Sequence, residues 1–338
     1  MANETNNFAE LISHCKEYGY IFQSSEIYDG LAAVYDYGQN GAQLKKNIRD
    51  YWWKSMTQMH DNIVGIDAAI FMHPTTWKAS GHVDNFSDPM IDNKDSNKRY
   101  RVDHLIEGFA DEQSTAGNGQ LAEQVLASMD ALLAKDDYAG LKQLIEDNKI
   151  QCAISKTCNW TDVRQFNLMF STEFGAVAAD NPDDNKVYLR PETAQGIFVN
   201  FLNVQKTGRM KIPFGIAQTG KAFRNEIVAR QFIFRMREFE QMEMQFFIRP
   251  GSQMEWYNFW KDERKKWHES IGIPASKLRF HDHVKLAHYA DAALDIEFEF
   301  PFGWKELEGI HSRTDFDLTQ HQTFSKKKMQ YFDNDIDP

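Results

Sequence analysis

The sequence is poor in cysteine, proline and glycine, and it contains no long apolar run. Three cysteines, an odd number, do not suit a disulfide framework, so we expect a reducing compartment, the cytoplasm. No run of about eighteen apolar residues occurs, so we expect no spanning helix and no membrane partner. The start, MANETNNFAE, lacks the basic and apolar regions of a secretory signal. The 9 prolines and 19 glycines are scattered, so no long linker is indicated.

Charge and apolar content indicate an ordinary globular protein. The 338 residues include 38 Lys+Arg and 49 Asp+Glu, a net charge of −11, with 42% hydrophobic and 26% charged residues. This acidic balance argues against binding nucleic acid over the whole surface, but it leaves a local basic site open.

Apolar periodicity predicts an α+β fold with a mainly antiparallel sheet flanked by helices. The helical patterns cover residues 8–18, 39–60, 119–134, 137–148 and 253–271. The strand patterns cover residues 63–72, 187–189, 212–226, 233–247, 278–283 and 295–307. The polar helical stretch at 104–184 resembles an insertion, which leaves residues 1–103 and 185–338 as the core.

One predicted strand, 234–247, has an unusual polar face with a single aromatic ring. If it is a strand, its odd positions share that face; they are Arg235, Arg237, Phe239, Gln241, Glu243 and Gln245. A cation, a stacking ring and a carboxylate in line can hold a phosphate, a base and an amine. A solvated strand face with one aromatic ring explains the pattern equally well.

Just upstream, Arg224 and Glu226 share a face of the preceding predicted strand, and residues 227–231 are expected to form the connecting loop. The arginine fork suits phosphate because it donates two parallel hydrogen bonds. Alone, such a pair is more commonly a surface ion pair. Two strands of this kind joined by one loop favour a phosphate site.

The segment 295–308 is predicted as one strand with an apolar side that ends in acidic residues. That side carries Ile296, Phe298, Phe300, Phe302 and Trp304, followed by Glu306 and Glu308. A carboxylate on a buried face needs a partner or a metal. Mg²⁺ with substrate phosphates would meet that need, whereas emergence of the strand into solvent would remove it.

The segment 189–196 joins a predicted strand to a helix. Pro191 restricts Arg190 to extended conformations, and Thr193 is expected to cap the helix. Glu192 at this turn is suited to binding an amine, or it is simply a favourable acid at a helix N-terminus.

Together these segments resemble the class II aminoacyl-tRNA synthetases, and within them the homodimeric glycyl-tRNA synthetase family. The second class motif is Phe-Arg-x-Glu, a loop, and then Arg/His, Phe and an acid at four-residue spacing. This sequence has Phe223-Arg224-Asn225-Glu226, and then Arg235, Phe239 and Glu243. Further family features are Tyr188-Leu-Arg-Pro-Glu-Thr-Ala-Gln-Gly-Ile-Phe198, Phe166-Asn-Leu-Met-Phe170 and Gly303-Trp-Lys-Glu-Leu307.

The resemblance implies residue roles. The implied catalytic residues are Arg224 on the α-phosphate, Arg235 on the γ-phosphate and Glu306, which would hold Mg²⁺ through ATP. The implied ATP site comprises Arg224, Asn225, Glu226, Phe234, Arg235, Met236, Arg237, Glu238, Phe239, Glu306 and Leu307, with Phe239 stacked on adenine. The implied substrate site comprises Arg101, Glu192, Phe239, Glu240, Gln241, Met242 and Glu243, with Glu192 and Glu243 facing the glycine ammonium.

The resemblance also implies an activity and its partners. It implies ATP-dependent formation of glycyl-adenylate and transfer of glycine to tRNA(Gly), with Mg²⁺ accompanying ATP. Residues 39–72 resemble the dimer motif, so we expect a homodimer. Two departures stand out: the third class motif and the C-terminal anticodon-binding domain are absent. We therefore expect a C-terminally truncated chain that cannot complete the reaction alone.

Two other readings remain for the residues. A synthetase-like binding or regulatory protein without catalysis would have no reason to keep the ATP residues, and a plain structural domain would not show their joint spacing. No structural zinc is expected, since Cys152 and Cys158 are too few and too far apart for four ligands. The pair His281 and His283 is read as alternate positions on an exposed strand.

Overall fold

A computed structural model describes residues 2–175, 185–227, 231–283, 286–287 and 289–333. The chain divides into two compact units. The first comprises Met1–His82, Phe170–Arg224 and Gln231–Pro338, and the second comprises Val83–Met169 and Asn225–Arg230. The loop expected at 227–231 falls mostly on residues 228–230, which lie outside the described residues.

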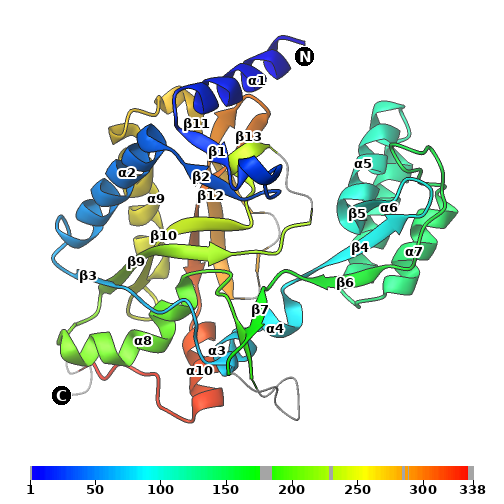
Figure 1. The fold of residues 1–338 in the computed structure, drawn as a ribbon. Helices are drawn as coiled ribbons and strands as arrows, with labels where there is room; N and C mark the ends of the chain where they lie inside the picture. Colours follow the sequence, from blue (N-terminus) through cyan, green and yellow to red (C-terminus); the bar gives the residue numbers. More distant parts are fainter. Residues whose placement is uncertain (1, 176–184, 228–230, 284–285, 288, 334–338) are drawn as a thin grey trace. The chain divides into compact units, whose positions relative to one another are not determined.

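The strands of the first unit form two three-stranded sheets and two short ribbons (Figure 1). One sheet has the order β10 (Glu238–Phe247), β9 (Phe214–Phe223) and β3 (Ile63–Ile66), and only its β3–β9 pair is parallel. The other is antiparallel, with the order β11 (Leu278–Asp282), β12 (Ala290–Phe300) and β13 (Gly303–Arg313). The ribbons pair β1 (Ile21–Gln23) with β2 (Tyr35–Tyr37) and β7 (Ser171–Glu173) with β8 (Lys186–Tyr188).

Helices cover both faces of the sheet formed by β3, β9 and β10. The helices of this unit are α1 (Ala2–Glu17), α2 (Gln39–Thr57), α3 (Pro74–Ala79), α8 (Ala194–Thr207), α9 (Gln253–Ser270) and α10 (Phe316–Ser325). The short helix α4 (His82–Asn85) begins at the last residue of the range Met1–His82 and continues into the second unit. On one face, Trp52 of α2 and Trp260 of α9 pack against Ala217. On the other face, Phe201 of α8 packs against Ile216, the alternate position of β9.

The second unit pairs three helices with a small antiparallel sheet. Its strands are β4 (Ser87–Asn93), β5 (Lys98–Arg101) and β6 (Arg164–Asn167), in the order β5-β4-β6. Its helices are α5 (Val102–Thr115), α6 (Gly119–Leu133) and α7 (Tyr138–Asp147). Ile91, Ile106, Leu141 and Trp160 belong to its buried core. The insertion limits 104–184 stay a prediction.

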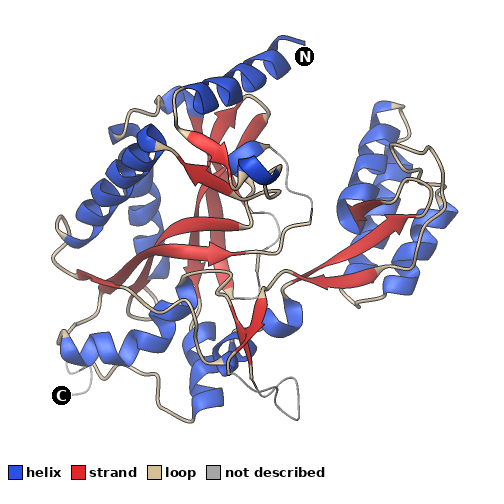
Figure 2. Ribbon diagram, viewed as in Figure 1, coloured by secondary structure: helices blue, strands red, loops and turns tan. Residues whose placement is uncertain are grey.

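The mixed α+β fold with mainly antiparallel sheets is confirmed (Figure 2). Helices α2, α6 and α7 match the predicted ranges closely, whereas the sequence pattern missed α5. No helix in the described ranges is both long and apolar enough to cross a membrane.

Four predicted strands need correction. The strand over 212–226 ends at Phe223, so Arg224 and Glu226 lie beyond it rather than on one of its faces. The strand over 63–72 ends at Ile66. The strand over 233–247 starts only at Glu238, because Gln231 and Phe232 adopt positive φ and residues 232–234 form a 3₁₀ turn. The predicted single strand over 295–307 is a hairpin: β12 ends at Phe300 and β13 starts at Gly303, whose φ of 100° favours glycine.

Candidate functional site

A cavity of about 620 Å³ lies in the first unit between the two sheets and the helices α8, α9 and α10. Several residues with predicted roles line it, namely Glu192, Arg224, Glu240, Gln241, Met242, Glu243, Glu306 and Leu307. Arg313 and Asp317, for which the sequence predicted no role, also line the cavity.

Two carboxylates, those of Glu192 and Glu243, contribute to the cavity wall. Glu243 accepts a hydrogen bond from the Thr193 hydroxyl at 2.7 Å, and Gln245 donates to its other oxygen at 2.7 Å. Burial raises the pKa of Glu243 to about 6, and the nearby charge of Glu192 acts in the same direction. Glu243 is therefore protonated more easily than an ordinary glutamate, partly because the Glu192 charge lies nearby.

Glu192 itself is held in its ionised form. Burial alone would raise its pKa, but His82, Arg313 and Gln195 outweigh burial and lower the pKa well below its usual range. Nε2 of His82 lies 3.5 Å from Oε2 of Glu192, and the Gln195 amide donates to Oε1 at 3.1 Å. The carboxylate with the low pKa and the carboxylate with the raised pKa thus stand together.

A buried polar network behind these carboxylates was not predicted from the sequence. Arg313 donates to Asp317 at 2.6 Å and lies 4.0 Å from the centre of the Tyr289 ring. Gln195 donates to Asp317 at 2.9 Å, and His321 lies within hydrogen-bonding distance of Gln195. The sequence offered one signal for this network. Charged residues from Arg313 to Asp317 begin at the end of β13, the strand that carries Glu306.

The predicted phosphate-binding and stacking residues meet at one end of the β9–β10 pair. Phe239 pairs with Ala222 across the ladder, and the Arg224 guanidinium lies 5.2 Å from the centre of the Phe239 ring. The same guanidinium donates to the carbonyl oxygen of Pro191 at 3.1 Å. The cation, the ring and the 191–193 turn are therefore adjacent.

Arg190 explains how this turn is held. Its guanidinium is buried and donates to the carbonyl oxygens of Lys221, at 2.6 Å, and Ala68, at 2.8 Å. A Cβ on Gly220 would lie 2.2 Å from the Arg190 guanidinium. Glycine at position 220 is therefore what lets Arg190 tie the turn to β9.

The acidic pair in β13 is split by a β-bulge, which corrects the prediction that both carboxylates share one side. Glu308 pairs with Ile296 and Glu306 with Glu297, and the register shifts between these two pairs. Glu308 contacts α9, where it accepts from Arg264 at 2.6 Å and lies 2.8 Å from Nε2 of His268. Its charge is therefore balanced by protein groups, without a metal.

Glu306 faces a different set of charges. Partial burial and the Asp295 carboxylate raise its pKa, while Arg224, His283 and Arg235 oppose that rise. Glu306 and Leu307 are exposed to solvent and both line the cavity. A cation beside Glu306 would relieve the repulsion between the two carboxylates.

Aromatic packing and an arginine side chain anchor the segment before β10. Phe234 packs edge-on against Phe300 and Phe302, and Arg237 donates from its guanidinium to the Ala32 carbonyl oxygen at 3.1 Å. Arg235 is exposed and Met236 half-buried. Their ATP contacts stay predictions.

The even positions of β10 face α2. Glu240 lies 2.6 Å from Nζ of Lys45 and 3.1 Å from the guanidinium of Arg49, and Glu238 accepts from Lys221 at 2.6 Å. Met242 is exposed. The predicted roles of these residues toward ATP or substrate stay predictions, with the odd positions closer to Glu192.

Arg101, Asn225 and Glu226 belong to the second unit. Arg101 forms ion pairs with Asp103 and with Asp88, the latter at 3.3 Å. The Asn225 backbone N–H donates to the Leu168 carbonyl oxygen at 2.8 Å, and Glu226 is buried. Their predicted substrate and ATP roles also stay predictions.

Two family models match the chain. The glycyl-tRNA synthetase insertion domain 1 matches residues 88–123 and 115–168. The tRNA synthetase class II core domain (G, H, P, S and T) matches residues 170–331.

Curated relatives align over nearly the whole chain. A glycine–tRNA ligase of Chlorobaculum tepidum is 55% identical over 96% of the chain and 69% of its own length. A glycine–tRNA ligase of Treponema denticola is 48% identical over 99% of the chain and 66% of its own length. One of Macrococcus caseolyticus is 49% identical over 97% and 68%. The chain thus spans about two thirds of the length of these relatives.

Proposed function

This chain belongs to the class II glycyl-tRNA synthetase family, and we propose that its cavity activates glycine with ATP for transfer to the 3′ end of tRNA(Gly). One observation carries the proposal: two carboxylates stand in one cavity wall, and the Arg224–Phe239 pair adjoins the same 191–193 turn. The cavity thus offers an ammonium site and a nucleotide site within one unit.

Glycine binds through its ammonium group to Glu192 and Glu243. These two half-buried carboxylates offer an ammonium ion negative charge and hydrogen-bond acceptors. Selection against larger amino acids is steric, since a pocket closed over Cα excludes even a methyl group. The family resemblance also gives Arg101, a residue of the second unit, a role toward the substrate.

ATP lies over the β9–β10 pair with its adenine on Phe239. Arg224 contacts the α-phosphate and Arg235 the γ-phosphate. The family resemblance also gives Asn225 and Glu226, residues of the second unit, a role toward adenine and ribose. Glu306 fits a Mg²⁺ ion carried by ATP, because its carboxylate faces the carboxylate of Asp295 and a cation would relieve their repulsion. When bound, Mg²⁺ neutralises charge on the phosphate oxygens.

The reaction needs no protein nucleophile. An oxygen of the glycine carboxylate bonds to the α-phosphorus in line, and the bond to the leaving pyrophosphate breaks. The terminal tRNA hydroxyl then bonds to the glycyl carbonyl carbon, and AMP leaves. The protein accelerates both steps by aligning the reactants and by placing the Arg224 cation where negative charge develops.

Several assignments outside the cavity belong to the same proposal. Residues 1–103 and 185–338 form the catalytic core, and residues 104–184 form the insertion. Residues 39–72 supply a homodimer contact, and the enzyme works in the cytoplasm, where tRNA is charged.

Glycine-dependent exchange between pyrophosphate and ATP, measured with the full-length enzyme, tests the activity. Exchange should require glycine and should be far weaker with alanine or serine. The binding of glycine and of ATP to the same chain, followed by calorimetry, separates binding from catalysis. Exchange with another amino acid but not with glycine would contradict the specificity. Binding of both ligands without exchange would favour the synthetase-like binding protein.

A further inference from the structure

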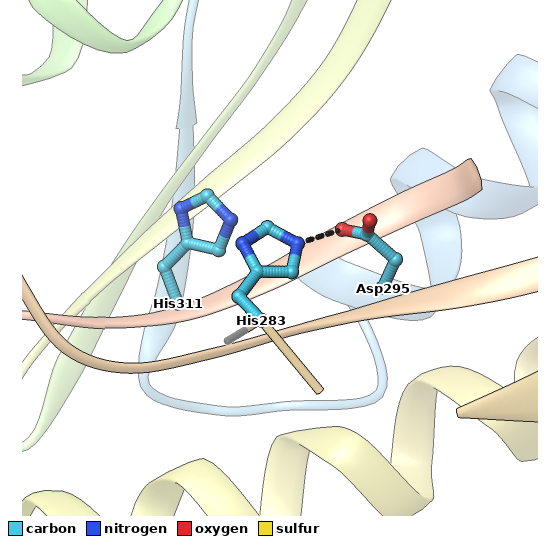
Figure 3. A group of neighbouring side chains, drawn as sticks. All are labelled: His283, Asp295 and His311. Carbon is cyan, nitrogen blue, oxygen red and sulfur yellow. Dashed lines mark ion pairs between the residues drawn. The ribbon is translucent and has the colours of Figure 1, made fainter. Parts of the chain in front are cut away.

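Three side chains with metal-ligating atoms meet on one face of the β11–β13 sheet (Figure 3). They are His283, just after β11, Asp295 of β12 and His311 of β13, and their ligand atoms all lie within 4.8 Å of one another. Nε2 of His283 is 3.0 Å from Oδ1 of Asp295, and the two imidazole rings are 5.7 Å apart.

The sheet ladder fixes the three positions. The His283 backbone N–H donates to the Ala293 carbonyl oxygen at 3.0 Å, and Ala293 in turn pairs with His311. Asp295 lies two residues beyond Ala293, on the same face. The ligand residues therefore project side by side from adjacent strands, on the rigid elements that precise metal sites need.

We propose that His283, Asp295 and His311 bind a divalent transition-metal ion of the Zn²⁺ type. Two imidazoles and one carboxylate suit Zn²⁺, Co²⁺ or Ni²⁺, whereas Mg²⁺ prefers oxygen ligands alone. Tetrahedral Zn²⁺, with bonds of about 2.0–2.2 Å, spaces its ligand atoms about 3.3 Å apart. The present spacing, within 4.8 Å, is close to that value.

Gly309 leaves the space next to these ligands open. A Cβ built on Gly309 would lie 3.1 Å from Nε2 of His311, 3.6 Å from Oδ1 of Asp295 and 3.5 Å from Oε1 of Glu306. Any side chain at position 309 would fill the space that an ion and its water need. Glu306 borders the same space.

A simple ion pair between His283 and Asp295 accounts for only part of this arrangement. Such a pair needs one imidazole and leaves the position of His311 beside both groups unexplained. Both imidazoles are needed only if all three groups share an ion. The two readings therefore differ in the effect of removing His311.

Cobalt titration of the 338-residue chain, freed of metal with a chelator, tests the site. One equivalent of Co²⁺ should bind and give visible ligand-field bands without thiolate charge-transfer bands, because the ligands are nitrogen and oxygen. Zn²⁺ should displace it, and excess Mg²⁺ should not. His283→Ala, Asp295→Asn and His311→Gln should each weaken binding at least about 100-fold, the upper range for losing even an outer-shell partner.

The control is His14→Gln, an exposed histidine of α1, which should bind Co²⁺ as the parent chain does. His311 is exposed, so the His311→Gln variant keeps the fold, and circular dichroism checks this. Absence of binding, or binding unchanged in both histidine variants, overturns the proposal. Binding lost in Glu306→Gln but kept in His283→Ala and His311→Gln also overturns it, because the ion then sits at the carboxylate assigned to ATP. Thiolate charge-transfer bands that vanish in Cys158→Ser would also overturn the proposal, because the ion would then be bound by a cysteine.

Discussion

The Thr193 hydroxyl donates to Oε2 of Glu243 at 2.7 Å, although Thr193 is the N-cap residue of α8. Its side chain makes no capping hydrogen bond; the N-cap position is as predicted, but the hydroxyl serves the carboxylate. The first turn of α8 is thereby joined to β10, and the two acidic residues of the cavity are held close together.

Glu243→Gln should weaken glycine binding. The proposed ammonium contact is a hydrogen bond to a charged group, worth about 1.5–3 kcal/mol, so KM for glycine should rise about 10- to 150-fold. The measurement is glycine-dependent pyrophosphate exchange in the full-length enzyme, with exposed Glu123→Gln as the control. A KM like that of the parent chain would remove Glu243 from the glycine site.

The pH dependence of glycine binding gives a separate check. The pKa of Glu243 is raised to about 6, so the carboxylate takes up a proton as the pH falls through that value. Glycine affinity should then drop roughly tenfold per pH unit below it, since the ionised fraction falls by that factor. The Glu243→Gln variant should lose this dependence. An identical profile in both chains would assign the titration to another group.

Phe239→Ala should weaken ATP binding. Stacking of a base on an aromatic ring is worth about 1–3 kcal/mol, which corresponds to roughly 5- to 150-fold in affinity. Calorimetric titration with ATP measures it, and exposed Phe332→Ala serves as the matched control. Unchanged ATP affinity in Phe239→Ala would contradict the proposed position of adenine.

Glu308→Gln should destabilise the first unit. The change leaves the buried Arg264 guanidinium without its carboxylate, and breaking such a pair costs about 3–5 kcal/mol. Urea unfolding at neutral pH measures this loss of stability. The control is Glu269→Gln, an exposed residue of α9, the helix that carries Arg264. Equal midpoints for the two variants would show that the network contributes little.

The free energy of unfolding of the Glu308→Gln variant should also depend differently on pH in the acid range. Arg264 and His268 outweigh burial and lower the pKa of Glu308 from 4.5 to about 2. Between those values the unfolded chain binds more protons than the folded one, so this stabilisation is present above about pH 4.5 and is lost as the pH falls toward 2. Glu308→Gln should show a shallower loss of stability over that range in urea unfolding.

Gly220→Ala should loosen the turn that carries Glu192. The new Cβ would meet the Arg190 guanidinium at 2.2 Å, and overpacking of this kind costs about 1–3 kcal/mol. Gly108→Ala in α5, which meets no atom within 4 Å, should not destabilise. Thermal unfolding compares the two, and equal stability would mean that Arg190 has an alternative position.

The sequence by itself determined the family and the components of the β9–β10 pair. The shared face of Phe239 and Glu243 was readable because side chains alternate regularly within a strand. The helices α2, α6 and α7 could also be predicted from the sequence, because apolar residues recur in each with the helical period.

Only the tertiary structure decided where the chain reverses and which distant residues meet. The alternation from Ile296 to Glu306 continues across the hairpin, so no local pattern marked the turn before Gly303 or the bulge that separates Glu306 from Glu308. The grouping of His82, Glu192 and Arg313, like that of the β11–β13 ligands, joins remote segments. Periodicity reports the face of a residue within one element, whereas strand register and packing decide which faces come together.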